Sequence, residues 1–357
     1  MRDIERRSFM QGVASVAMLG GFGAAGMAPA AFGQTALEAS SLRSNAKSFL
    51  WGAEDFAQGT GLFTGAGLKL SLAATNRGVN QDALIGGAAD ILLGAPTQNM
   101  RVHIRRQPVK MICGWVNKFA SNVVIRKAAA DKAGVTEASA PVQKAAALRG
   151  LKIGTTGPGG GPDQLARYLM RMAKIDPATD AELVPIQGGG AAILAAYERG
   201  TIDGFVLSSP TSDVAISKFG AVYLFNMVTN PPPELEDYLY ITASVSEKTA
   251  KEKPAELTAY CKGIALALRG ISGDPAGFKA WAKTHFGDMD PALFETAFSN
   301  NIGMYMKTPV PSRKQFDLNL EFLDAELKQL AQPGIPAGFR FEDAYDLSFA
   351  EKAMASL

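Results

Sequence analysis

The segment at residues 155–163 has the composition of a ligand-binding turn. It reads Thr-Thr-Gly-Pro-Gly-Gly-Gly-Pro-Asp and joins a predicted strand to a predicted helix. Glycine lets the main chain approach a ligand without a Cβ in the way, and the start of a helix presents free N–H groups at the positive end of its dipole. The segment can therefore hold an anion or another polar group. A plain flexible turn is the alternative interpretation.

Two phosphate-binding motifs do not fit this segment. No Gly-Lys-Ser/Thr follows it, so it is not a P-loop, and Pro162 stands where a dinucleotide-binding fingerprint would have its third glycine. The candidate ligand-binding residues within it are Thr156, Gly157, Gly159, Gly160 and Gly161.

Other candidates follow predicted strands, because ligands of open parallel sheets bind at the carboxyl ends of the strands. Lys47 or Arg77 would neutralise an anion, unless each is a solvated surface charge. Trp115 would stack on a ring, unless it is a core aromatic. Asn300, Asn301 and Met304 are further candidates from the C-terminal helices. The full set after the strands is Asn45, Lys47, Ser48, Arg77, Thr97 and Trp115 in the first half of the chain, and Gly188, Gly189, Ser208 and Ser209 in the second.

The strands and helices that must position these residues repeat in the two halves. Each half runs through a strand, a glycine turn, a helix, a Gly-x-x-Asp step and an apolar strand, ending at residues 95–97 and 208–210. This rhythm predicts an α/β protein with a mostly parallel sheet. The expected strands are 68–72, 90–94, 109–113, 122–125, 151–154, 183–186, 203–207, 222–225 and 238–242.

Helical patterns fill the gaps and the C-terminal third. The expected helices are 81–88, 163–173, 191–199, 255–268, 277–285, 291–298 and 312–330. An Ala/Lys-rich linker is expected at 127–148. The run Pro231-Pro232-Pro233 marks a second boundary, because prolines cannot sit in a helix interior or a central strand.

The N-terminus carries the features of an export signal. Arg6-Arg7-Ser8-Phe9 resembles a twin-arginine motif, and an apolar Gly/Ala-rich stretch follows to about Met27. We expect residues 1–33 to be a signal peptide, cleaved between Ala30 and Gly33. The alternative is a membrane anchor, for which the stretch is short. A periplasmic location follows from cleavage.

Composition excludes several function classes. The formal net charge is +2 over 357 residues and no block of like charge stands out, so we expect no nucleic-acid partner, which would need a clustered basic face. Cys113, Cys261, His103 and His285 lack metal-ligand spacing, so we expect no metal and no cofactor. The sequence leaves open whether Cys113 and Cys261 form a disulfide. The sequence shows no Ser-His-Asp or paired-carboxylate arrangement, so we expect that the protein is not an enzyme.

The order of five stretches resembles the substrate-binding proteins of ABC importers in the nitrate/sulfonate/taurine and NMT1/THI5-like group. They are residues 54–63, 66–70, 86–96, 148–154 and 184–210. The resemblance implies a two-lobe periplasmic-binding-protein fold (type II) in which lobe 2, residues 127–230, is inserted in lobe 1, residues 36–126 and 231–357.

The same resemblance implies that a monomeric chain binds a small molecule and delivers it to an ABC transporter permease. The ligand would be a sulfonate-like anion, a carboxylate or a pyrimidine-like compound. A binding protein of another importer type, a sensor lobe and a THI5-like enzyme are the alternatives. The enzyme's Cys-rich run is missing here.

Overall fold

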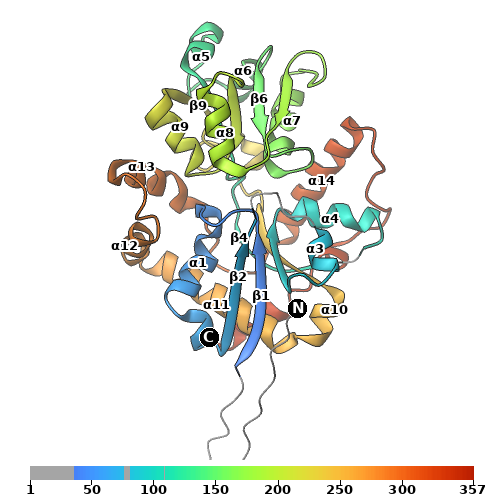
Figure 1. Ribbon diagram of the computed structural model, residues 1–357. Helices are drawn as coiled ribbons and strands as arrows, with labels where there is room; N and C mark the ends of the chain where they lie inside the picture. Colours follow the sequence, from blue (N-terminus) through green and yellow to red (C-terminus); the bar gives the residue numbers. More distant parts are fainter. Residues whose placement is uncertain (1–35, 76–80, 108) are drawn as a thin grey trace, which may run out of the picture. The chain divides into compact units, whose positions relative to one another are not determined.

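The computed structural model describes residues 36–75, 81–107 and 109–357, and within them the chain forms two five-stranded sheets (Figure 1). The first sheet has the order β2-β1-β3-β10-β4 and the second β7-β6-β8-β5-β9. The first comprises β1 Leu37–Arg43, β2 Leu68–Ala74, β3 Ile91–Gly94, β4 Val109–Val116 and β10 Ile241–Ser246; the second comprises β5 Asn122–Arg126, β6 Lys152–Thr155, β7 Glu182–Pro185, β8 Gly204–Leu207 and β9 Ala221–Phe225. The expected signal peptide lies outside the described residues.

Both sheets are mixed but mostly parallel, as expected: four strands of each sheet run in one direction, and only β10 in the first sheet and β5 in the second run the opposite way. β1 pairs in parallel with β2 and β3, and β6 with β7 and β8. β10 runs antiparallel to β3 and β4, and β5 antiparallel to β8 and β9. A parallel neighbour requires a crossover connection within one sheet. β5 and β10 are instead the strands at which the chain arrives from the other sheet, so this constraint does not apply to them.

The chain passes between the sheets at residues 117–121 and again at residues 226–240. The domain boundaries expected near residues 126 and 230 stay predictions. β5, which ends at Arg126, pairs with strands of the second sheet. The expected strand at 238–242 begins only at Ile241, because Tyr238 and Tyr240 pack on Phe119 of the other crossing segment, with ring centroids 4.7 and 4.6 Å away. We call each sheet with the helices packed on it a lobe, first and second in chain order.

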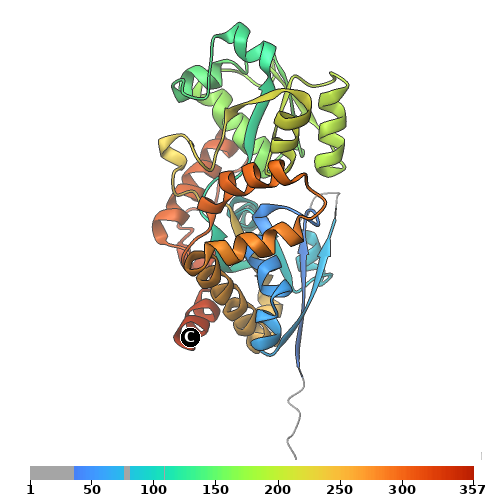
Figure 2. The same ribbon diagram turned by 90° about the vertical axis from the view of Figure 1, so that its left-hand side faces the viewer.

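Helices surround both sheets (Figures 1 and 2). The second lobe carries α5 Lys127–Ala133, α6 Pro141–Ala146, α7 Gly161–Met172, α8 Gly189–Glu198 and α9 Thr211–Phe219. The expected linker at 127–148 is therefore largely helical, since Pro141 starts α6 and Gly134 ends α5 in a left-handed conformation. The first lobe carries α1 Gly52–Gly59, α2 Leu62–Gly65, α3 Gln81–Ile85, α4 Pro96–Ile104, α10 Glu247–Glu252, α11 Pro254–Gly273, α12 Pro275–His285, α13 Pro291–Asn301, α14 Arg313–Gln329, α15 Phe341–Ala344 and α16 Ser348–Ala355, with 3-10 turns at Phe49–Trp51, Pro233–Leu235 and Ile302–Met304.

Local sequence explains where several of these helices begin. Ser312 caps α14 through its hydroxyl and Gln315 returns the bond to the Ser312 main chain, which is a capping box. Asp274 and Asp290 cap α12 and α13, and each cap is followed by a proline in the first turn. None of the helices in the described residues combines the length and apolar character that a membrane span requires.

Candidate functional site

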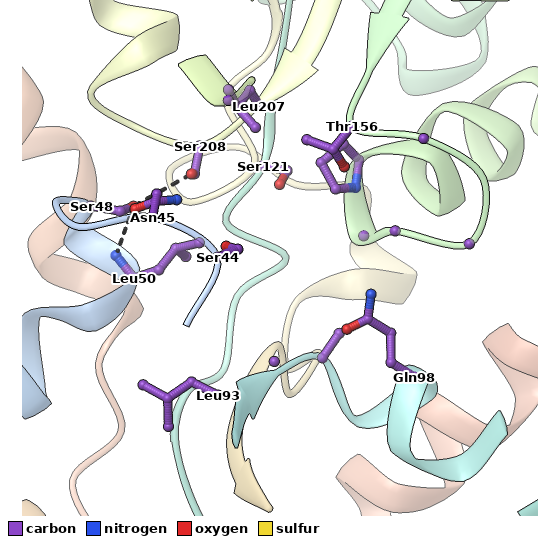
Figure 3. A pocket seen from close by; sticks show the side chains of 18 of the residues that line it. Ser44, Asn45, Ser48, Leu50, Leu93, Gln98, Ser121, Thr156, Leu207 and Ser208 are labelled. Atoms are coloured by element: carbon purple, nitrogen blue, oxygen red, sulfur yellow. Dashed lines mark hydrogen bonds between the residues drawn. The ribbon is translucent and has the colours of Figure 1, made fainter. Parts of the chain in front are cut away.

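A cavity of about 780 Å³ lies between the two lobes, within the size range of small-molecule sites. The first lobe contributes the segment after β1, the end of β3 and one face of α4. The second lobe contributes the turns after β6, β7 and β8. Ser121 and Tyr240 of the crossing segments close the inner side. Figure 3 shows Ser48 and Ser208 at one end of the cavity and Gln98 and Thr156 at the other.

The turn after β6 approaches the crossing segment so closely that it requires glycine. A Cβ on Gly161 would lie 2.5 Å from the hydroxyl oxygen of Tyr240, and a Cβ on Gly160 would lie 2.8 Å from Oγ1 of Thr156. Gly157 has a φ of 114°, which side-chain-bearing residues rarely adopt. The turn therefore lines the cavity with main chain.

Three helices of the second lobe begin at this cavity. β6, β7 and β8 are parallel neighbours, so their carboxyl ends meet at one edge of the sheet. α7, α8 and α9 start there at Gly161, Gly189 and Thr211, all of which line the cavity. Their unpaired N–H groups and positive dipole ends favour a negatively charged or hydrogen-bond-accepting ligand.

A buried ion cluster positions the segment after β1. Arg43 donates to Asp55 at 2.6 Å, to Glu54 at 3.2 Å and to the main-chain oxygen of Ala46 at 2.7 Å. Ser41 and Tyr260 also donate to Glu54. Burial raises the pKa of Glu54, and the Arg43 charge opposes that rise. Because Ala46 lies between the cavity residues Asn45 and Lys47, the cluster fixes the shape of this wall.

The lobes touch at the Ser208 end of the cavity. Ser48 donates to the main-chain oxygen of Ser209 at 3.0 Å, and Asn301 of α13 donates to the Ser209 hydroxyl at 2.7 Å. The Ser209 hydroxyl in turn donates to Asp213, which also accepts from Tyr223. Burial raises the pKa of Asp213. Met304 is buried and does not line the cavity, and Asn300 contacts Asp213 at 3.5 Å.

Most of the sequence-predicted residues line this cavity, whereas Thr97, Trp115, Asn300, Asn301 and Met304 do not. Thr97 is fully buried beneath it and donates to Gln164 at 2.9 Å. Trp115 is a buried core residue outside the cavity lining, and its indole N–H donates to the main-chain oxygen of Leu50 at 2.8 Å. Arg77 lies outside the described residues. The residues that line it are Asn45, Lys47, Ser48, Thr156, Gly157, Gly159, Gly160, Gly161, Gly188, Gly189, Ser208 and Ser209.

Sequence reasoning missed the α4 face and the inner residues Ser121 and Tyr240. In the sequence, Pro96 closes an apolar strand pattern, but proline directly after a strand is also a common helix start, and here it begins α4. From that start, Gln98, Arg101, Val102 and Arg105 have the spacing of one helix face, and all of them line the cavity.

The charged side chains that line the cavity are all cationic: Lys47, Arg101 and Arg105. No aspartate or glutamate is among the described lining residues. In the described part of the chain, no group of three or more His, Cys, Asp or Glu residues is placed to hold a metal ion. Cys113 and Cys261 are buried free thiols.

Comparison with known proteins agrees with this geometry. The model of the NMT1-like family matches residues 56–284, more than half of the chain. Curated protein sequences give no match.

Solved structures give matches over nearly the whole chain. The nitrate-binding protein NrtA from Synechocystis has a TM-score of 0.67 at 14% identity, covering 90% of this chain and 89% of its own. The alkanesulfonate-binding protein SsuA from Xanthomonas axonopodis, bound to MOPS, has a TM-score of 0.64 at 14% identity, covering 84% and 95%. The aliphatic sulphonate-binding protein SsuA from Escherichia coli has a TM-score of 0.62 at 14% identity, covering 84% and 94%. These matches confirm the periplasmic-binding-protein fold expected from the sequence.

Proposed function

The chain belongs to the NMT1-like family, and on this premise we propose that it is an exported solute-binding protein that delivers a small organic anion to an ABC importer. The observation that carries the proposal is the cavity between the lobes. Three helix N-termini face it from one side, and its charged side chains are all cationic. Such a site stabilises negative charge and offers no carboxylate that would repel it.

The size of the cavity and the kinds of residue that line it narrow the ligand class. A volume of about 780 Å³ suits an organic molecule rather than a small inorganic ion. Leu93, Ile186 and Leu207 add apolar surface, and hydroxyl groups are plentiful. An organic sulfonate or carboxylate meets both requirements.

The same proposal includes export of the chain and closure of the two lobes on the ligand. Residues 1–33 direct the folded chain to the periplasm and are removed there. The lobes rotate about the crossings at 117–121 and 226–240, and the contacts between Ser48, Ser209 and Asn301 form on closure.

The first experiment is a thermal-shift screen of the purified full-length chain, preceded by native mass spectrometry to find any co-purified molecule. The screen uses alkanesulfonates including MOPS, aromatic carboxylates and pyrimidines. A ligand that binds only the folded chain raises its melting temperature. Small-angle scattering at saturating ligand should then show a smaller radius of gyration.

Two glycine variants provide the matched control. Gly161→Ala places a methyl group against Tyr240 and should weaken binding, whereas Gly65→Ala on α2 meets no atom within 4 Å and should leave binding unchanged. A screen without a binder, together with a native spectrum free of small molecules, would contradict the proposal.

A further inference from the structure

The cavity is charged at one end and uncharged at the other. Arg101 and Arg105 of α4 line one end, where Arg101 donates to Gln332 and, through Glu326, is linked to Gln164 of α7. At the other end the lining groups are hydroxyls and amides of Ser44, Asn45, Ser48, Ser208, Ser209 and Thr211. Lys47 lies at this second end, but its ammonium group pairs with Asp288 at 2.7 Å.

Arg101 is held rigidly at the charged end. Its Nη1 donates to Oε1 of Gln332 at 2.8 Å and its Nη2 to Oε2 of Glu326 at 2.7 Å. Its Nε is buried and has no hydrogen-bond partner among the described residues. A guanidinium group carries more N–H donors than these two bonds use, so Arg101 keeps donors for a ligand.

The counter-ion of Arg101 is a buried residue outside the cavity lining. Glu326 on α14 does not line the cavity, and its side chain is almost fully buried. Its Oε2 also accepts from Gln164 of α7 at 2.7 Å, and Oε1 of Gln164 accepts from Thr97 of α4. Gln164 lies one turn after Gly160, so this chain of hydrogen bonds ties Arg101 to the glycine turn of the second lobe.

Arg105 adds a second positive charge on the same face. It follows Arg101 by four residues at the end of α4, and its exposed side chain makes no ion pair with a described residue. The ion pair with Glu326 therefore leaves this end of the cavity with net positive charge. The opposite end has no comparable excess, because Asp288 balances Lys47.

We propose that Arg101 binds the acidic group of the ligand, and that the ligand is an organic anion with one acidic end and one uncharged hydrogen-bonding end. This inference rests on the proposed function and assigns a direction to the ligand within the same site. The acidic group lies between the α4 arginines and the start of α7. The uncharged end contacts the hydroxyl groups near Ser48 and Ser208, and Leu93 and Leu207 pack on the part between them.

Inorganic sulfate serves as a probe for the acidic subsite. The full-length chain is titrated with millimolar sodium sulfate by calorimetry, with sodium chloride replaced to hold ionic strength constant. We expect one sulfate per chain. Arg101→Gln should weaken it at least about tenfold, as expected for loss of a charged hydrogen-bonded partner. Lys47→Gln removes the same charge from the other end and should change the affinity by less than about twofold.

Arg101→Lys separates the binding role from a folding role. It keeps the positive charge but loses the planar donor pair, so we expect sulfate affinity between those of the wild type and Arg101→Gln. Circular dichroism checks that each variant is folded. If Arg101→Gln does not fold, Arg105→Gln replaces it in the sulfate titration and removes the second positive charge at the same end of the cavity.

Three results would overturn the inference. They are absence of saturable sulfate binding, equal losses in Arg101→Gln and Lys47→Gln, and a second sulfate that only Lys47→Gln removes. None of them bears on whether an organic ligand binds and closes the lobes, which the screen and the scattering measurement decide separately.

Discussion

The two walls of the cavity are built on different principles. The wall of the second lobe is mostly main chain: glycine turns after β6 and β7, and the starts of α7, α8 and α9. The wall of the first lobe is mostly side chains, from Ser44 to Trp51 and along α4. Main-chain amides have the same chemistry in any sequence, so they supply a general preference for negative charge. We therefore expect the side chains of the first lobe to contribute most to the choice of ligand.

The support behind each wall differs in the same way. Bare glycine turns are held by the strands and helices that flank them. The side-chain wall depends on buried charges, above all on Arg43 between Glu54 and Asp55. A buried ion that loses its partner is costly, whereas an exposed one rehydrates. Damage to the first wall should therefore show in stability, and damage to the second mainly in binding.

The largest effect is expected for Arg43→Gln. Removing the cation leaves two buried carboxylates without it and should lower the free energy of unfolding by about 3–5 kcal/mol. Urea denaturation measures the change. Lys69→Gln, which breaks the exposed pair with Glu38 on the same sheet, should change the free energy of unfolding far less, because solvent screens that pair. Equal costs for the two variants would show that the ion cluster does not support the first wall.

Gly161→Ala tests the main-chain wall. The added methyl group overlaps the Tyr240 hydroxyl and should cost about 1–3 kcal/mol together with a loss of ligand affinity. Removing that hydroxyl in a Gly161→Ala, Tyr240→Phe double variant should recover part of the loss, which a double-mutant cycle quantifies. Strict additivity of the two substitutions would contradict the close packing of this turn.

Trp115→Phe asks whether the first wall extends to this residue. The substitution removes a buried hydrogen bond to Leu50 and leaves a small cavity, so it should cost about 1–2 kcal/mol. Ligand affinity, measured by calorimetry, should not change. A weaker affinity without a loss of stability would place Trp115 in the binding wall.

The smallest effect is a pH dependence from Glu326. Burial raises the pKa of Glu326 above its ordinary value of 4.5. A carboxyl whose pKa is higher in the folded chain contributes stability below the ordinary value and loses that contribution as the pH rises through the folded value. Relative to Glu326→Gln, the wild type should gain stability as the pH falls through the raised pKa of Glu326 to its ordinary value of 4.5. Parallel urea-denaturation profiles for the two proteins would contradict this.

The local patterns of the sequence were enough to predict much of the second wall. Gly157 to Gly161 lie between β6 and α7 because a strand, a glycine turn and a helix start are adjacent along the chain. Ser208 and Ser209 follow β8 for the same reason. The expected strands of both sheets were found near their predicted positions, since short apolar runs between turn residues identify strands without reference to their partners.

In the first wall the sequence predicted Asn45, Lys47 and Ser48, and only the tertiary structure revealed the α4 face and the core position of Trp115. The indole N–H of the buried Trp115 donates to Leu50, which lies 65 positions away, and Gln164 donates to Glu326 across 162 positions. The antiparallel direction of β5 and β10 likewise depends on where the chain crosses between sheets. A sequence pattern reports the conformational preference of neighbouring residues, and it carries little information on which distant side chains will neutralise or cover one another. The main-chain wall of this cavity could therefore be predicted from the sequence, whereas the arginines of α4 and their buried counter-ion Glu326 could be found only in the fold.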